Sequence, residues 1–123
     1  MSTTQTIERT TLTHLIYNED YCRKVIPFIK PIYYADRQER VVFEEIEKFL
    51  DKYNTLPTKE TLTIGVDNRK DINDEDYKKV VEIISSLDKT EVDLQWLHDE
   101  TEKFCKDKAI YNAVLDGISI IDG

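Results

Sequence analysis

The sequence predicts an all-α fold, a small helical bundle of about five or six helices that ends in one long helix. The chain has 123 residues with only three glycines and three prolines, and its apolar residues recur at helical spacing instead of forming the runs typical of buried strands. With 40% hydrophobic and 34% charged residues, it is large enough for one core and too small for two. We therefore expect a single domain, in which residues 1–91 form a helical head and residues 92–123 a long helix.

Two helices are predicted in the first quarter of the chain. Apolar residues recur at helical spacing over 7–17, and Asn18 is suited to cap a second helix over 19–29. Pro27 is expected to kink that helix or end it early, because proline lacks the amide hydrogen of the helical ladder. Residues 28–34 are therefore expected to turn, with one helical turn at their end.

The third helix carries the widest apolar face and is predicted to be the best core helix. Asp36 is its N-cap, and Glu39, three residues later, is placed to complete a capping box. From this helix and its neighbours we predict the core residues Leu15, Val42, Ile46, Phe49, Tyr77, Val81, Ile84, Leu97 and Phe104. If Phe49 is buried, its replacement by alanine should cost about 3 to 5 kcal/mol.

Two shorter helices are predicted in the middle of the chain. Thr58 begins a helix over 59–66, whose end is marked by Gly65. Asn73 caps the next helix, with Asp76 at the position of a capping box.

Residues 92–121 are predicted to form one helix that is too long and too apolar for the head alone. It would span roughly 45 Å, against a diameter near 35 Å for a compact chain of this size, so one end must project. Its first half, around Leu94, Leu97 and Phe104, is expected to belong to the core. Its second half is predicted to bind a partner through Ile110, Val114, Leu115, Ile118 and Ile121. Burial of these five side chains would contribute about 7 to 15 kcal/mol, against an association cost of about 4 to 15, so the contact should be weak unless more of the partner supports it.

The charge and the composition exclude several classes of function. A formal net charge of −8 argues against sequence-independent DNA binding, and the basic residues between 69 and 79 alternate with acidic ones as on a solvated surface. No apolar run approaches the roughly 20 residues that cross a bilayer, and the first residues lack the features of a signal peptide. Two cysteines fit a reducing compartment. We therefore expect a cytoplasmic protein that binds neither DNA nor membranes directly.

No pattern in the sequence predicts catalysis or a cofactor. A glycine-rich Walker motif is absent, which excludes nucleotide hydrolysis in these residues. Two histidines and two cysteines could suggest zinc, but His98 and Cys105 lie about 10 Å apart along a helix, too far for one ion. His14 and Cys22 fall on separate predicted helices. Four independent packing or surface residues are the favoured interpretation, so no catalytic, cofactor-binding or metal residues are predicted.

Four segments resemble a known family in their order and spacing. They are THLIYNEDYCRKVIPFI (13–29), YYADRQERVVFEEI (33–46), LPTKETL (56–62) and WLHDETEKF (96–104). Together they resemble the N-terminal domain of DnaB-type replicative helicases, most closely the version found in T-even bacteriophages. The resemblance covers nearly the whole chain, from residue 12 to residue 121.

The resemblance implies a fold and a function. In this family the head is a small helical bundle, the long helix is the first arm of a helical hairpin, and the hairpins pair subunits into a collar on a hexameric ring. The collar contacts primase in the bacterial members. The resemblance therefore implies a non-catalytic N-terminal domain of a phage replicative DNA helicase, acting in the host cytoplasm, that mediates ring assembly and docks primase or a loader.

The sequence also departs from the family's pattern. The second hairpin arm, the linker and the ATP-dependent motor with its Walker motifs are not in the sequence, so we expect these residues to be cut from a larger helicase that binds ATP and Mg elsewhere. The bacterial members approach a proline through glycines, where this chain has Tyr53-Asn-Thr-Leu-Pro57. No primase-contact positions are transferred for that reason.

Two other functions stay open at this point. A free-standing helical adaptor or inhibitor could offer the surface over 110–121 to a different partner, and a stop codon directly after Gly123 in the native gene would favour it. A metal-dependent enzyme using His14, Cys22, His98 and Cys105 ranks third. Metal analysis that found no stoichiometric zinc would remove that hypothesis.

Overall fold

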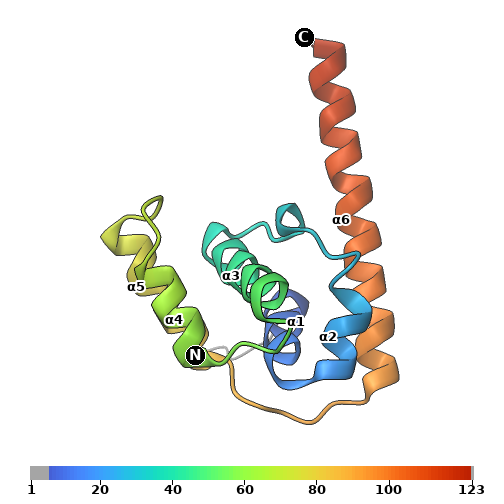
Figure 1. Ribbon diagram of the computed structural model, residues 1–123. Helices are drawn as coiled ribbons and strands as arrows, with labels where there is room; N and C mark the ends of the chain where they lie inside the picture. Colours follow the sequence, from blue (N-terminus) through green and yellow to red (C-terminus); the bar gives the residue numbers. More distant parts are fainter. Residues whose placement is uncertain (1–5, 123) are drawn as a thin grey trace, which may run out of the picture.

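The computed structural model describes residues 6–122, and it describes side chains for residues 6–117. Within this part the chain is all-helical and contains no strand, which confirms the predicted fold class. In chain order the elements are α1 (Ile7–Tyr17), α2 (Glu19–Val25), the 3-10 helix η1 (Pro31–Tyr33), α3 (Arg37–Tyr53), α4 (Lys59–Asp67), α5 (Asp74–Ser86) and α6 (Leu94–Asp122). Figure 1 shows that α6 runs along one side of the head and continues well beyond it.

Helix α3 is the centre of the head. It packs against α1, α4, α5 and η1, whereas α6 contacts α1, α2 and η1. In Figure 1, α4 and α5 therefore lie on one side of α3, and α2 and α6 lie on the other. The long helix is attached to the head through its first two helices and the segment that precedes α3.

Side chains cap most of the helices, and the caps Asn18, Asp36 and Asn73 lie at predicted positions. Thr6, Asn18, Asp36 and Asn73 each accept a hydrogen bond from a backbone amide in the first turn that follows. Asp93 does the same for α6, since its carboxylate accepts from the amide of Trp96 at 2.9 Å. The expected early end of the second helix is confirmed, because α2 stops at Val25, two residues before Pro27.

The capping boxes predicted at the starts of α3 and α5 are both wrong. Asn73 caps α5 alone, and the carboxylate of Asp76 accepts a hydrogen bond from the Gln38 amide at 2.9 Å. Asp36 likewise caps α3 alone, and the carboxylate of Glu39 accepts a hydrogen bond from Nε of Arg9 on α1 at 3.1 Å. A reciprocal capping box forms instead at α4, between Thr58 and Thr61. A partly buried ion pair to another helix therefore replaces the local hydrogen bond that the capping motif predicts.

The core is built around aromatic residues from separate elements. Tyr34, which follows η1, stacks on Phe43 of α3 with ring centroids 5.2 Å apart and on Phe104 of α6 at 5.7 Å. The predicted core residues Leu15, Val42, Ile46, Ile84, Leu97 and Phe104 are all buried. Tyr34 and Phe43, whose spacing also favours the core, are buried as well, and so is Ile83, which the sequence did not predict.

Three predicted core residues, Phe49, Tyr77 and Val81, are only partly buried. The buried residues of α3 end at Ile46, and Phe49 lies one turn later, where α3 runs past the core. On α5 the buried stripe passes through 80, 83, 84 and 87, which turns Val81 to the side. Tyr77 lies near the start of α5 and packs against the edge of the core.

Gly65 is needed for the close approach of α4 to α3. A Cβ at this position would collide with the carboxylate of Glu45, which is buried and accepts a hydrogen bond from Arg69 at 3.0 Å. The helix ends at Asp67, within one residue of the predicted end, but Gly65 does not terminate it, because the glycine lies inside α4 and does not have a positive φ. Packing against a buried carboxylate, and not a turn, explains the glycine.

Replacing Gly65 by alanine is expected to destabilise the head by about 1 to 3 kcal/mol, although alanine has the higher helix propensity. The added methyl group would displace the Glu45 carboxylate from its ion pair with Arg69. Gly117→Ala is the matched control, because a Cβ there meets no atom within 4 Å and should be neutral or stabilising. Thermal unfolding measures both changes. A Gly65→Ala variant at least as stable as the parent would contradict the packing of α4 on α3.

Candidate assembly interface on the projecting helix

The first half of α6 is fixed to the head by one buried face. Leu97, Thr101, Phe104 and Cys105 are buried and recur at helical spacing. The hydroxyls of Tyr21 on α2 and Thr101 are 2.6 Å apart, and Thr101 also donates to the carbonyl of Leu97 at 2.7 Å. Burial raises the pKa of Tyr21, so this phenol stays protonated at neutral pH. These contacts set the direction in which α6 leaves the head.

The expected burial of Leu94 is wrong. It is the first residue of α6 and is half-exposed, because the buried face of the helix begins one turn later at Leu97. The head therefore holds α6 over a shorter stretch than the sequence suggests.

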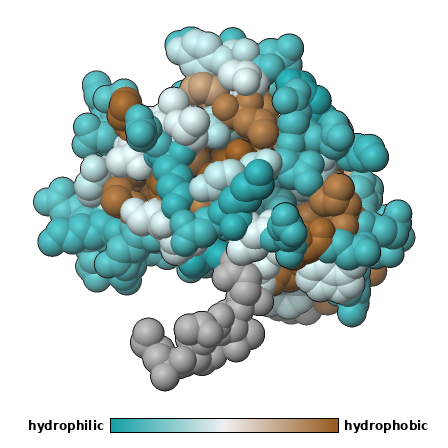
Figure 2. Space-filling view, turned by 90° about the horizontal axis from the view of Figure 1, so that it is seen from below, coloured by the Kyte–Doolittle hydropathy of each residue, from teal (hydrophilic) through white to brown (hydrophobic). Residues whose placement is uncertain are grey.

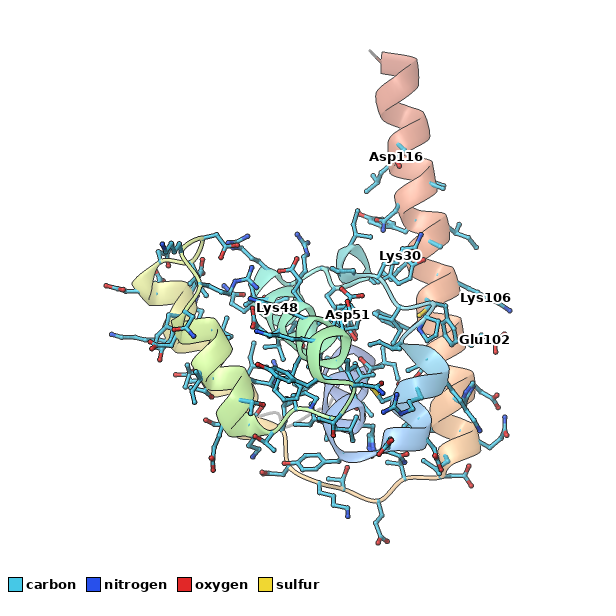
Figure 3. The ribbon with its side chains drawn as sticks, viewed as in Figure 1. Lys30, Lys48, Asp51, Glu102, Lys106 and Asp116 are labelled. Atoms are coloured by element: carbon cyan, nitrogen blue, oxygen red, sulfur yellow. The ribbon has the colours of Figure 1, made fainter. Side chains whose placement is uncertain are left out.

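The second half of α6 presents apolar side chains to solvent. Ile110, Tyr111, Val114 and Leu115 are between 44% and 64% exposed. Figure 3 shows Glu102 and Lys106 beside the head and Asp116 on the part of α6 that projects beyond it. Three of the five predicted interface residues, Ile110, Val114 and Leu115, thus lie exposed on or near the projecting part. Ile118 and Ile121 lie outside the residues whose side chains are described.

The exposed apolar surface only partly continues the head-packing face of the helix. Each helical residue rotates by about 100°, so Tyr111 and Leu115 lie within about 40° of Leu97, whereas Val114 and Ile110 lie about 100° and 140° from it. We call the surface formed by Ile110, Tyr111, Val114 and Leu115 the arm surface. A second helix could pack on the arm surface without displacing the head.

Other exposed apolar side chains are more scattered. Figure 2 shows a mostly hydrophilic face of the head, on which hydrophobic residues form separate patches. The large ones elsewhere on the described chain are Phe28, Ile32, Tyr53, Ile64, Leu94 and Trp96. The arm surface brings four such residues within six positions of one helix, which is the densest grouping.

The arm surface alone is too small for tight association. Its four side chains are about half exposed, so burying what remains would contribute about 3 to 6 kcal/mol. Association costs about 4 to 15 kcal/mol. A stable complex therefore needs further contacts from the partner.

The residues of the metal hypothesis do not form a site in the structure. Among the residues with described side chains, no group of three or more His, Cys, Asp or Glu residues could hold an ion. Cys22 and Cys105 are buried free thiols, and burial raises the pKa of each to about 11. Both thiols are therefore protonated and unreactive at neutral pH. Burial also lowers the pKa of His14, whose ring meets Tyr21 edge-on.

None of the described helices combines the length and the apolar character that a membrane-spanning helix needs.

Comparison with known proteins supports the resemblance seen in the sequence. No family model matches the chain. The chain is 29% identical over 109 residues to a DnaB-like replicative helicase of Enterobacteria phage T4. The match covers 89% of this chain and 23% of the phage protein, so the chain spans about a quarter of the length of the curated relative. The similarity to replicative helicases is thus confirmed, over a share of the relative consistent with one N-terminal domain.

Proposed function

We propose that these residues form the non-catalytic N-terminal domain of a phage replicative DNA helicase and assemble its subunits through the arm surface of α6. The similarity to the phage T4 helicase supports the role in replication. The observation that carries the assembly role is the exposed apolar surface on a helix that projects from a folded head. In this proposal the ATP-dependent motor, with its Mg, belongs to other parts of the protein.

The geometry suggests how assembly would work. The head needs only the first half of α6 for its core, because Leu97, Thr101 and Phe104 are its buried contacts. The second half is then available to a mate helix, either the second arm of a hairpin or an arm of another subunit. Ile110 and Val114 are turned away from the head-packing face, which lets the mate lie beside α6 while the head keeps its own contacts. Six such subunits would form the ring, and the collar that results would dock primase or a loader.

Assembly is expected to fail when a charge enters the arm surface. Val114→Asp should raise the dissociation constant of self-association at least about tenfold, because a carboxylate would be buried against the mate helix. Ala113→Asp is the matched control, because it adds the same charge at the preceding residue, which is exposed and points about 100° away from Val114 around the helix. Sedimentation of the full-length protein measures association, and thermal unfolding should show both heads intact.

Two results would overturn the proposal. The first is a Val114→Asp variant that associates as strongly as the parent, at concentrations where the parent associates. This result would mean that the arm surface has no role in assembly. If the native gene continues past Gly123 without a Walker motif, the assignment of these residues to a helicase is excluded. A stop codon directly after Gly123 would favour a free-standing adaptor that uses the same surface for another protein.

A further inference from the structure

A second apolar site lies on the head, in a groove of about 340 Å³ between α3 and α4. Phe49 and Tyr53 of α3 line one side, and Ile64 of α4 lines the other. The two aromatic rings pack on each other with centroids 4.7 Å apart, one helical turn from each other. Tyr53 is 55% and Ile64 62% exposed, so no described element of the chain covers the groove.

Basic side chains dominate the charge of the groove. Lys48 and Lys52 line it from successive turns of α3, and neither forms an ion pair with a described residue. The ammonium of Lys52 lies 5.3 Å from the centre of the Tyr53 ring. By contrast, Lys59, Lys79 and Lys106 elsewhere on the surface pair with acidic side chains.

One acidic residue, Glu45, also lines the groove, so the lining carries two positive side chains against one negative side chain. The Glu45 carboxylate is buried and is held by Arg69 at 3.0 Å, and this arginine also pairs with Glu44 and Asp71. Glu47 lies about 100° from Lys48 around α3, and Asp51 lies about 60° from it. Neither carboxylate forms an ion pair with Lys48 or Lys52. On a chain of net charge −8, the groove is therefore a local site of unpaired positive charge beside exposed aromatic rings.

We propose that this groove docks an acidic segment of a partner protein that carries one or two large apolar side chains. The apolar side chains would enter between Tyr53 and Ile64, and the carboxylates would meet Lys48 and Lys52. Charge complementarity favours an acidic peptide over an apolar or basic one. Nucleic acid fits less well, because two lysines on an acidic domain neutralise too few phosphates.

The groove is independent of assembly through the arm surface. Helix α6 packs against α1, α2 and η1, and Figure 1 places α4 on the other side of α3 from α6. A subunit held by its arm would therefore still offer the groove to a partner. Figure 3 labels Lys48 and Asp51 on α3, apart from the α6 residues Glu102 and Lys106.

A labelled synthetic peptide of aspartates with one phenylalanine and one leucine is the probe for this groove. It should bind the full-length protein saturably in fluorescence anisotropy, and Lys48→Glu with Lys52→Glu should weaken binding at least about tenfold. Ile64→Ser should weaken it as well. The matched control is Lys24→Glu with Lys30→Glu, because these exposed lysines give the same change in net charge away from the groove and should leave binding unchanged.

Each alternative outcome overturns the docking site. Binding that is equally weakened by the control pair, or that is as tight for a peptide with serines in place of phenylalanine and leucine, would indicate charge attraction without a groove. Absence of saturable binding up to millimolar peptide, or tighter competition by a single-stranded oligonucleotide, would also exclude an acidic-peptide site. Sedimentation of the Lys48→Glu, Lys52→Glu variant should match the parent, which separates a failure here from a failure of the assembly proposal.

Discussion

Replacing Phe43 by alanine is expected to lower the free energy of unfolding by about 3 to 5 kcal/mol. Phe43 is fully buried and packs on Tyr34, which in turn packs on Phe104. The three rings join α3, the segment after η1 and α6. A cavity at Phe43 would not close readily, because the helices around it are held by other contacts, such as the buried hydrogen bond between the hydroxyls of Tyr34 and Thr11 at 2.8 Å.

Phe49→Ala is the matched control on the same helix. Phe49 lines the open groove and is only partly buried, so its loss should cost about 1 to 2 kcal/mol. Urea unfolding at neutral pH, followed by circular dichroism, measures both variants. A cost for Phe49→Ala as large as that for Phe43→Ala would mean that α3 is rotated from the orientation described.

Replacing Arg9 by methionine is expected to cost about 2 to 4 kcal/mol at pH 7. Arg9 donates to Glu39 at 3.1 Å and to the hydroxyl of Ser86 at 3.3 Å, so it joins α1 to α3 and α5. Glu39 is only 7% exposed. Without Arg9, its carboxylate would remain in the head with no counter-charge. The partial exposure of Arg9 keeps the cost below that of a fully buried pair.

This cost should depend on pH in a defined direction. Burial raises the pKa of Glu39 above 4.5, and Arg9 opposes that rise, so the variant's folded-state pKa should be higher still. An acid whose pKa is higher when folded binds protons more tightly in the folded state, so stability falls as pH rises from the unfolded pKa through the folded one. The deficit of Arg9→Met should therefore shrink as pH falls from 7 toward 5.

Urea unfolding at both pH values checks this prediction. Adding Glu39→Gln to the Arg9→Met variant removes the titrating group and should remove the pH dependence of the deficit. A deficit of equal size at pH 5 and pH 7 in the single variant would show that the loss comes from packing of the arginine and not from the carboxylate.

Local signals in the sequence were sufficient to predict the helices. The N-caps at Asn18, Asp36 and Asn73 act through bonds within one turn, and the stop near Pro27 follows from the missing amide hydrogen. The projection of α6 also followed from the sequence, since length alone makes a helix of this size exceed the head. These features depend on short-range geometry.

The sequence did not predict which apolar residues the other helices cover. Helix α3 carries more apolar surface than the core can bury, and periodicity does not distinguish Phe43, which packs on Tyr34 in the core, from Phe49, which lies in the groove. For the same reason, periodicity could not predict the groove between α3 and α4. The only signal was two lysines and two aromatics, each pair one turn apart on one side of α3.

Local sequence motifs also did not predict the polar contacts between residues that are distant in the chain. Glu39 matched a capping motif, but an arginine thirty residues earlier in the chain binds it instead. Gly65 matched a helix end, but it leaves room for a carboxylate from another helix. In both cases the partner is distant in sequence, and a local motif cannot contain that information.

Helix α6 is uninterrupted from Leu94 to Asp122, so no hinge within this helix separates the head from the far end. A protein that binds the far end of this helix also fixes the orientation of the head about the helix axis. The buried contacts at Leu97, Thr101 and Phe104 hold the head to the helix. A tilt of about 10° where α6 leaves the head would move its far end by roughly 4 Å. A rotation or tilt of one end of the helix is thus transmitted to the other end.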